Sequence, residues 1–201
     1  MSLIIPYSEA CQRNKDAILD VARPYFEKIS SVLEIGSGTG QHAVYFAQNC
    51  PNLIWQTSDQ SQHLQGIEAQ LSNAGVENVL PPFALDVKQK LWSPSASKYD
   101  CIFTANTFHI MAWAEVQAFF KGLSQLTQKG SYLVVYGPFK YAGKFTSASN
   151  QQFDQSLRAR AGASAIRDFE EVNKLAAEAN FGLLSDTPMP ANNQCIVWQN
   201  S

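Results

Sequence analysis

The sequence has no surplus of basic residues and no hydrophobic run of the roughly 18 residues that a membrane-spanning helix requires. Its 15 lysines and arginines are balanced by 17 aspartates and glutamates, so the formal net charge is −2. Proteins that work by neutralising phosphates need clustered lysine and arginine in excess. We therefore expect neither nucleic acid nor a membrane as a partner.

Cysteine is also scarce, and no two of the four cysteines stand at the C-x-x-C spacing of zinc and redox sites. This predicts reduced thiols and no metal centre. Residues 2–7 are too short for the apolar region of a signal peptide, and no basic residue precedes them. Together these features favour a cytoplasmic protein, whose oligomeric state the sequence leaves open.

Length and composition predict one folded domain over residues 1–201. The chain is 45% hydrophobic and 16% charged, as globular proteins are, and about 100 to 200 residues is the usual size of one domain. Within it we expect an N-terminal helical segment over residues 1–30, with a helix from Asn14 to Phe26, and an insertion on the substrate side over residues 138–167.

Strand-like runs alternate with helical patterns through most of the chain. The strands are expected at residues 31–35, 53–58, 79–85, 99–105, 131–136, 182–186 and 194–199. Alternation of this kind predicts an α/β fold with a mostly parallel sheet, helices on both faces and a C-terminal antiparallel hairpin. Pro81 and Pro82 place the third strand at a sheet edge, because proline cannot donate to the ladder.

A glycine turn follows the first strand, with glycine at positions 36, 38 and 40. Such a turn lets a ligand approach bare backbone at the carboxyl end of the sheet. A dinucleotide fingerprint would place its third glycine at Gln41, and Glu34 would oppose a nearby pyrophosphate. The pattern therefore favours a cationic ligand without phosphates, while an ordinary structural turn remains the alternative.

Two aspartates follow the second and third strands. Asp59 lies nineteen residues after Gly40, where a carboxylate can accept hydrogen bonds from both hydroxyls of a ribose. Asp86 is placed to accept from the exocyclic amine of a purine. The alternatives are a helix N-cap for Asp59 and a turn-forming role for Asp86.

The run from Val32 to Gly40, taken with Asp59 and Asp86, resembles the cofactor motifs of class I S-adenosylmethionine-dependent methyltransferases. The resemblance implies a Rossmann-like seven-stranded sheet and S-adenosylmethionine as cofactor. It also implies that Asp59 binds the ribose and Asp86 the adenine. The residues facing the methionine part would be Glu34, Gly36, Ser37, Gly38 and Gly40.

A closer resemblance extends over nearly the whole chain. Residues 13–15, 37–42, 55–56, 136–139 and 146–150, with Asn106 and His109, are similar to the methyltransferase-like proteins of domain-of-unknown-function family 938, which include methyltransferase-like 26. The resemblance leaves the methyl acceptor unassigned. Within these motifs we assign Tyr136 and Asn150 to the substrate side and Arg13 to the carboxylate of the cofactor.

The loop after the fourth strand is the candidate catalytic segment. It lacks the Asn-Pro-Pro-Tyr or Asp-Pro-Pro-Tyr run that holds an amine acceptor. Asn106 is placed to hold the cofactor or a substrate donor, and His109 to take a proton from a hydroxyl or thiol. A packed or helix-capping histidine is the alternative for His109, and we assign no role to His42 or His63.

Only five arginines occur, and three of them, Arg158, Arg160 and Arg167, fall within ten residues. Because arginine binds carboxylate and phosphate bidentately, we expect Arg158 and Arg160 to recognise an acidic small substrate. The alternative is a solvated helix face paired with Asp154 and Asp168.

These features predict methyl transfer from S-adenosylmethionine to a small molecule. One alternative is a protein that binds S-adenosylmethionine or S-adenosylhomocysteine without catalysis. A nicotinamide-dependent reductase is the weaker alternative.

Overall fold

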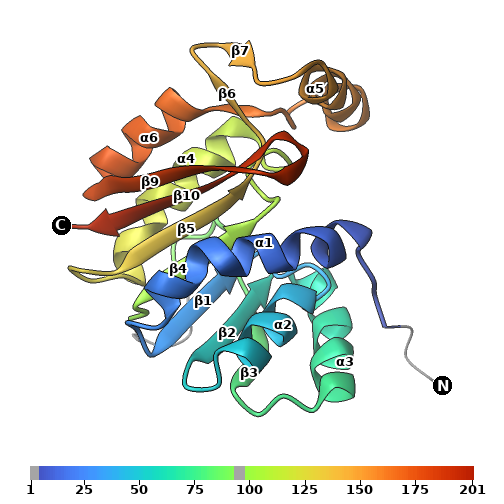
Figure 1. Ribbon diagram of the computed structural model, residues 1–201, viewed down its shortest axis with the longest axis vertical. Coiled ribbons are helices and arrows are strands. Elements are labelled where there is room, and N and C mark those ends of the chain that lie inside the picture. The colour runs from blue at the N-terminus through green and yellow to red at the C-terminus, as the bar shows by residue number, and fades with distance from the viewer. Residues whose placement is uncertain (1–4, 93–97) are drawn as a thin grey trace.

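One seven-stranded sheet forms the centre of the computed structural model, which describes residues 5–92 and 98–201 (Figure 1). Its strand order is β3-β2-β1-β4-β5-β10-β9. The strands are β1 (Ser31–Ile35), β2 (Ile54–Asp59), β3 (Val79–Ala84), β4 (Cys101–Ala105), β5 (Tyr132–Gly137), β9 (Phe181–Met189) and β10 (Asn193–Asn200). The predicted Rossmann-like fold is confirmed.

The first five strands of the sheet run parallel, and β10 lies antiparallel to both β5 and β9. Strand order reverses between β1 and β4, which is the point where ligands bind in open α/β sheets. β3 lies at the sheet edge, as Pro81 and Pro82 predicted. β9 is the other edge strand and therefore accommodates Pro188, which the sequence analysis placed outside any strand.

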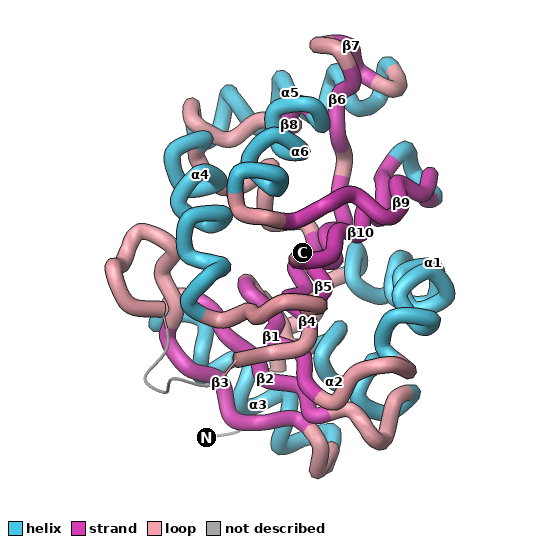
Figure 2. Tube along the Cα trace, turned by 90° about the vertical axis from the view of Figure 1, so that its left-hand side faces the viewer, coloured by secondary structure: helices cyan, strands magenta, loops and turns pink. Residues whose placement is uncertain are grey.

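Helices cover both faces of the sheet, as Figure 2 shows in a view turned from that of Figure 1. On one face, α1 (Glu9–Phe26) and α2 (Gln41–Asn49) pack over a core that includes Phe26, Phe46 and Trp55, and α3 (Leu64–Ala74) lies beside them. On the other, α4 (Trp113–Gly122) and α6 (Phe169–Glu178) pack over a second core that includes Phe119 and Trp198. No helix among the described residues is long and apolar enough to cross a membrane.

The first helix begins five residues before the predicted start at Asn14. Ser8 is its N-cap, and the Ser8 side chain accepts a hydrogen bond from the backbone N–H of Cys11 at 3.3 Å. The first turns carry no buried apolar residue, so helical periodicity becomes visible only from Ile18. Residues 1–4 of the predicted helical segment lie outside the described residues.

The segment over residues 138–167 forms a small sheet and a helix above the carboxyl end of the main sheet (Figure 1). Its strands, with order β7-β6-β8, are β6 (Phe139–Tyr141), β7 (Lys144–Phe145) and β8 (Arg167–Asp168). The helix is α5 (Ala148–Ala161). The strands of this segment were not predicted from the sequence, because they are too short for a visible alternation.

Candidate functional site

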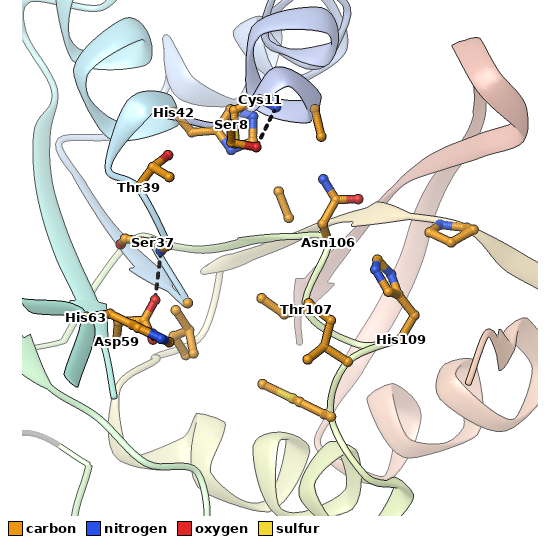
Figure 3. Close-up of a pocket in the computed structure, with 18 of the residues that line it drawn as sticks. Ser8, Cys11, Ser37, Thr39, His42, Asp59, His63, Asn106, Thr107 and His109 are labelled. Atoms are coloured by element: carbon orange, nitrogen blue, oxygen red, sulfur yellow. Dashed lines mark hydrogen bonds and ion pairs between the residues drawn. The ribbon is translucent and has the colours of Figure 1, made fainter. Parts of the chain in front are cut away.

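A cavity of about 820 Å³ opens at the carboxyl ends of β1, β2, β4 and β5. In Figure 3, Asp59 and His63 lie on one side and Asn106 and His109 on the opposite side. Its wall includes Cys11, Arg13, Gly36, Ser37, Gly38, His42, Asp59, His63, Asp86, Asn106, His109, Glu115, Asn150 and Phe153. The size is that of a cofactor or small-molecule site, which usually lies between about 300 and 1,000 Å³.

The glycine turn after β1 depends on glycine at its first position. Gly36 has φ +79°, and a Cβ there would lie 2.6 Å from Cγ2 of Thr107 in the loop after β4. Gly38 has φ +57° with open space at its Cβ position, so it presents bare backbone. Gly40, with φ +76°, precedes α2 behind the wall and does not line the cavity.

Four backbone N–H groups of this turn are engaged within the protein. Gly36 and Ser37 both donate to the carbonyl of Ser58 at 3.0 Å, Gly38 donates to Asp59 at 2.7 Å, and Gly40 donates to Ser37 at 2.8 Å. These four donors are therefore not available to a phosphate, which needs free N–H groups. This supports the expectation of a ligand without phosphates.

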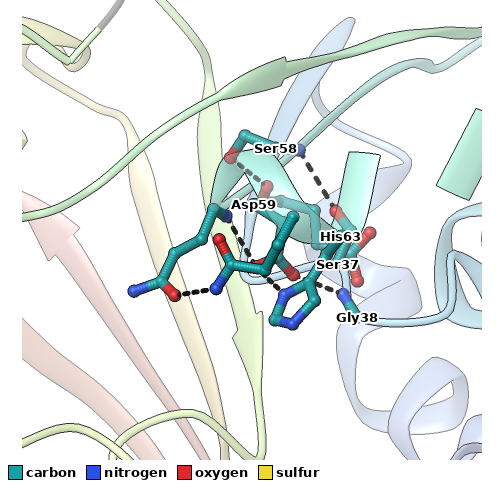
Figure 4. A network of polar contacts seen from close by, with 8 residues as sticks. Ser37, Gly38, Ser58, Asp59 and His63 are labelled. Atoms are coloured by element: carbon teal, nitrogen blue, oxygen red, sulfur yellow. Dashed lines mark hydrogen bonds and ion pairs between the residues drawn. The ribbon is translucent and has the colours of Figure 1, made fainter. Parts of the chain in front are cut away.

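Asp59 ends β2 with its side chain nearly buried, and it is the centre of a polar network (Figure 4). Its Oδ2 accepts from Gly38 N, and its Oδ1 accepts from Gln60 N and His63 Nδ1, each at 2.7 Å. A carboxylate offers about four acceptor positions. One position on Oδ2 is therefore left for a ligand, and a second becomes available if the half-exposed His63 turns away.

Glu34 does not line the cavity. The side chain is 1% exposed and accepts a hydrogen bond from Trp55 Nε1 at 3.1 Å. Burial raises the pKa of Glu34 to about 7, so near neutral pH the carboxylate is only partly charged. Contact with the methionine part of the cofactor, which the resemblance implied for Glu34, does not fit this position, because the side chain points to Trp55 in the core beneath α1 and α2.

Asn106 follows β4 in the left-handed backbone region, with φ 60°. Asparagine tolerates this conformation better than most residues. Its backbone N–H donates to the carbonyl of Tyr136 at 2.8 Å, which fixes the start of the loop. The side chain consequently reaches into the cavity, as Figure 3 shows.

His109 also lines the cavity and is 7% exposed. Burial, together with the nearby positive charge of Arg167, lowers the pKa of His109 to about 4. The imidazole is therefore neutral at pH 7 and has a free lone pair. Its ring meets the ring of Phe153 edge to face, with centroids 5.3 Å apart.

Arg167 holds the loop that carries His109. The guanidinium donates to the carbonyls of Phe108 at 3.0 Å and Ala163 at 2.9 Å, and also to that of Met111. These bonds tie the loop after β4 to the segment after α5. Arg167 thus acts within the structure, with its guanidinium bound to backbone carbonyls. Burial, and after it the nearby charge of Arg158, lower the pKa of Arg167.

Arg158 and Arg160 do not line the cavity. The Nε of Arg158 donates to Asp154 Oδ2 at 2.7 Å, one helical turn earlier in α5, and Arg160 is exposed. The predicted arginine pair for an acidic substrate is therefore not assembled at this site. The alternative pairing with Asp154 is present for Arg158, because residues four apart share a helix face.

Tyr136, a further predicted substrate residue, lies on β5. It is buried on the sheet face that α1 covers and does not line the cavity. Asn150 does line it, and its Nδ2 donates to Thr146 Oγ1 and to the carbonyl of Asn192, both at 2.9 Å. Asp86 and Arg13 also line it. Arg13 is well exposed and lies 3.6 Å from Glu9.

Several lining side chains were not predicted from the sequence, among them His42, His63 and Phe153. His42 pairs with Asn14 through a 2.7 Å hydrogen bond to its Nε2, and burial lowers its pKa to about 4. His63 pairs with Asp59, and the spacing of four residues was the available signal for it. Nothing in the sequence indicated that Phe153 lines the cavity, because a single aromatic residue in a polar helix is not specific to a binding site.

A family model described as "Protein of unknown function (DUF938)" matches residues 5–200 of the chain. Among solved structures, human N-acetylserotonin methyltransferase in complex with SAM is 13% identical, with a TM-score of 0.81 over 96% of this chain and 53% of that one. The mitomycin 7-O-methyltransferase MmcR is 15% identical, with a TM-score of 0.79 over 94% and 54%.

An O-methyltransferase family protein from Burkholderia thailandensis is 13% identical, with a TM-score of 0.77 over 96% of this chain and 60% of that one. The chain thus spans little more than half the length of these structures. At such identities the likeness concerns the fold, which is that of S-adenosylmethionine-dependent methyltransferases.

Proposed function

The chain belongs to the family described as "Protein of unknown function (DUF938)", and we propose that it transfers a methyl group from S-adenosylmethionine to a small molecule. One observation carries the proposal. A single cavity joins the buried carboxylate of Asp59 to the neutral imidazole of His109 across the switch point of the sheet. One end of that cavity suits a nucleoside, and the other suits a nucleophile that must lose a proton.

The residues present fit S-adenosylmethionine. Its sulfonium and ammonium groups give it a net positive charge, and the cavity wall contains the carboxylates of Asp59, Asp86 and Glu115. Asp59 has one open acceptor position for a ribose hydroxyl, and bare backbone at Gly38 permits close approach. Arg13 is the wall cation that would meet the carboxylate of the cofactor.

When bound, the cofactor supplies an activated methyl group on sulfur. The task of the protein is then to hold the nucleophile in line with that group and to exclude water. Asn106 offers an amide donor and acceptor at the carboxyl end of β4. The loop that carries it is fixed by Arg167, so the amide is held in place before any ligand arrives.

His109 is placed to receive the proton of a hydroxyl or thiol acceptor. Its pKa of about 4 makes it a weak base towards a resting hydroxyl. An oxygen that is gaining a methyl group becomes far more acidic, so a weak base in contact with it suffices. The neutral imidazole also avoids placing a second positive charge beside a sulfonium group.

Two alternatives are less well supported. A protein that only binds the cofactor would not need the cavity to continue past Asn106 to His109 and Phe153. A nicotinamide-dependent reductase would need backbone donors for the pyrophosphate, and four donors of the glycine turn, those of Gly36, Ser37, Gly38 and Gly40, are already engaged.

The test is calorimetric titration of the protein with S-adenosylmethionine and S-adenosylhomocysteine. We expect Asp59→Ala to weaken both by roughly tenfold to a hundredfold, since a hydrogen bond to a charged group is worth about 1.5 to 3 kcal/mol. Asp59→Asn separates charge from shape, and Glu68→Ala, which removes an exposed carboxylate of α3, is the control. The proposal fails if neither ligand binds wild-type protein at millimolar concentration.

A further inference from the structure

The far end of the cavity forms a chamber of its own, which we call the acceptor chamber. It is lined by Asn106, His109, Ile110, Pro138, Asn150 and Phe153. The rings of His109 and Phe153 are in contact, Asn150 lies one helical turn before Phe153, and Gly137, next to Pro138, faces Nδ1 of His109. These residues come from the loop after β4, the end of β5 and α5.

Two of them are large apolar side chains left open to solvent. Ile110 is 63% exposed and Phe153 is 39% exposed, although both line the cavity. Their backbone is held firmly, since Ser164 Oγ donates to the carbonyl of Ile110 at 2.7 Å and Asp154, next to Phe153 on α5, accepts from Ile166 N at 2.7 Å. Apolar side chains that are exposed beside a cavity, on a backbone held by hydrogen bonds, form a surface that a ligand would bury.

The charges around the cavity oppose an anionic ligand. Three carboxylates line the wall, of which Asp86 and Glu115 lie 3.9 and 3.1 Å from the ammonium group of Lys88. The lining cation, Arg13, is well exposed and lies 3.6 Å from Glu9. Arg158 is paired with Asp154 outside the wall, and the guanidinium of Arg167 is bound to backbone carbonyls. An acidic acceptor would therefore find no unengaged arginine fork beside His109 among the described residues.

We propose that the methyl acceptor is an uncharged small molecule with a flat, apolar body that packs between Phe153 and Ile110 and presents its nucleophile to Asn106 and His109. The inference rests on the proposed function for the chemistry at Asn106, but the chamber itself is defined without the cofactor. A flat ring offers both faces to the apolar side chains of Phe153 and Ile110, which line the cavity, while the amide of Asn106 orients the polar end.

Three probes of one size test this by calorimetry at pH 7, with and without saturating S-adenosylhomocysteine. They are 2-naphthol, 2-naphthoate and trans-decahydro-2-naphthol, which isolate the effects of charge and of flatness. We expect 2-naphthol to bind at least tenfold more tightly than either of the other two. The two titrations distinguish the claims, because failure of S-adenosylhomocysteine to bind removes the proposed function and leaves the probe ranking as a separate result.

Variants connect the probes to the chamber. Phe153→Ala should weaken 2-naphthol about tenfold, as loss of an aromatic contact and its buried area predicts. Ile110→Ala should weaken it less, and neither should alter S-adenosylhomocysteine affinity. Leu184→Ala removes an apolar side chain of similar exposure on β9, away from the cavity, and should change nothing.

If 2-naphthoate binds as tightly as 2-naphthol or more tightly, the proposal is overturned in favour of an acidic acceptor. If trans-decahydro-2-naphthol binds as tightly as 2-naphthol, the acceptor need not be flat and that part of the proposal is wrong. Absence of binding by all three probes also overturns it. So does a Phe153→Ala protein that is folded by circular dichroism and binds 2-naphthol as wild type does.

Discussion

Replacing Glu34 by glutamine should stabilise the protein at alkaline pH more than at acidic pH. The carboxyl group lies under the glycine turn at 1% exposure, with Trp55 Nε1 donating to it at 3.1 Å. Glutamine keeps the shape and an acceptor for Trp55 while removing the ionisation. The variant therefore isolates the free energy of holding a carboxylate in this core.

The magnitude follows from the pKa. Burial raises the pKa of Glu34 from 4.5 to about 7, so between those values the folded state binds a proton that the unfolded state has released. The unfolding free energy consequently falls as the pH rises through this interval and is level above it. At 1.36 kcal/mol per unit, this group alone lowers stability by about 2 to 3 kcal/mol between pH 5 and pH 8.

Two buried histidines change the unfolding free energy with pH in the opposite direction, in wild type and in Glu34→Gln alike. The pKa values of His42 and His109 are lowered to about 4, so each histidine adds stability as the pH rises from about 4 towards 6.5. The pH profile of wild type alone is therefore uninformative. Subtracting the wild-type profile from that of Glu34→Gln cancels the contribution of the histidines and leaves the contribution of the Glu34 carboxyl group.

Urea unfolding at pH 5 and pH 8 measures the difference, with Glu68→Gln on the exposed face of α3 as a control expected to show none. A Glu34→Gln profile parallel to that of wild type would refute the reasoning from burial. The same variant tests function. Since Glu34 lies outside the cavity wall, S-adenosylmethionine affinity should stay within about threefold of wild type, whereas a direct ion pair with the ligand would cost more.

Further predictions concern the cavity wall. Gly36→Ala brings a Cβ within 2.6 Å of a methyl group in the loop after β4 at positive φ, so we expect a loss of about 2 kcal/mol in urea unfolding and weaker cofactor binding in calorimetry. Arg13→Ala should weaken S-adenosylmethionine binding about fivefold, while Arg23→Ala, in the last turn of the same helix, should not; equal affinities would remove Arg13 from the site. Arg167→Met removes the cation that helps to lower the pKa of His109, so NMR titration should show that pKa rising, with unfolding easier by about 3 kcal/mol.

The fold was predictable because its signals are local. Each of the features used determines the conformation of the segment in which it lies. These features are the alternation of strands and helices, the glycine turn and the two prolines of β3. The small sheet of β6, β7 and β8 was not predictable, since a strand of two or three residues has no period. The start of α1 was missed for a related reason, as its first turns are polar all round and only the cap at Ser8 marks them.

The cofactor end of the cavity was predictable for the same reason that the sheet was. Asp59 and Gly36 end or follow strands, and the carboxyl ends of parallel strands meet at one edge. Glu34 shows the limit of such reasoning. It stands two residues before Gly36, but strand side chains alternate between faces, and the alternation sends this carboxyl group into the core.

The acceptor end depends on contacts that sequence distance hides. Arg158 and Arg167 are nine residues apart, yet a helix end and a turn lie between them, and one side chain pairs within α5 while the other reaches the loop after β4. Phe153 and His109 are 44 positions apart and their rings touch. Clustering of arginines along the chain therefore suggested an anion site, whereas Arg158 and Arg167 are engaged with Asp154 and with backbone carbonyls. The chemistry of the acceptor has to be inferred from the side chains that the fold brings together, which are apolar and neutral.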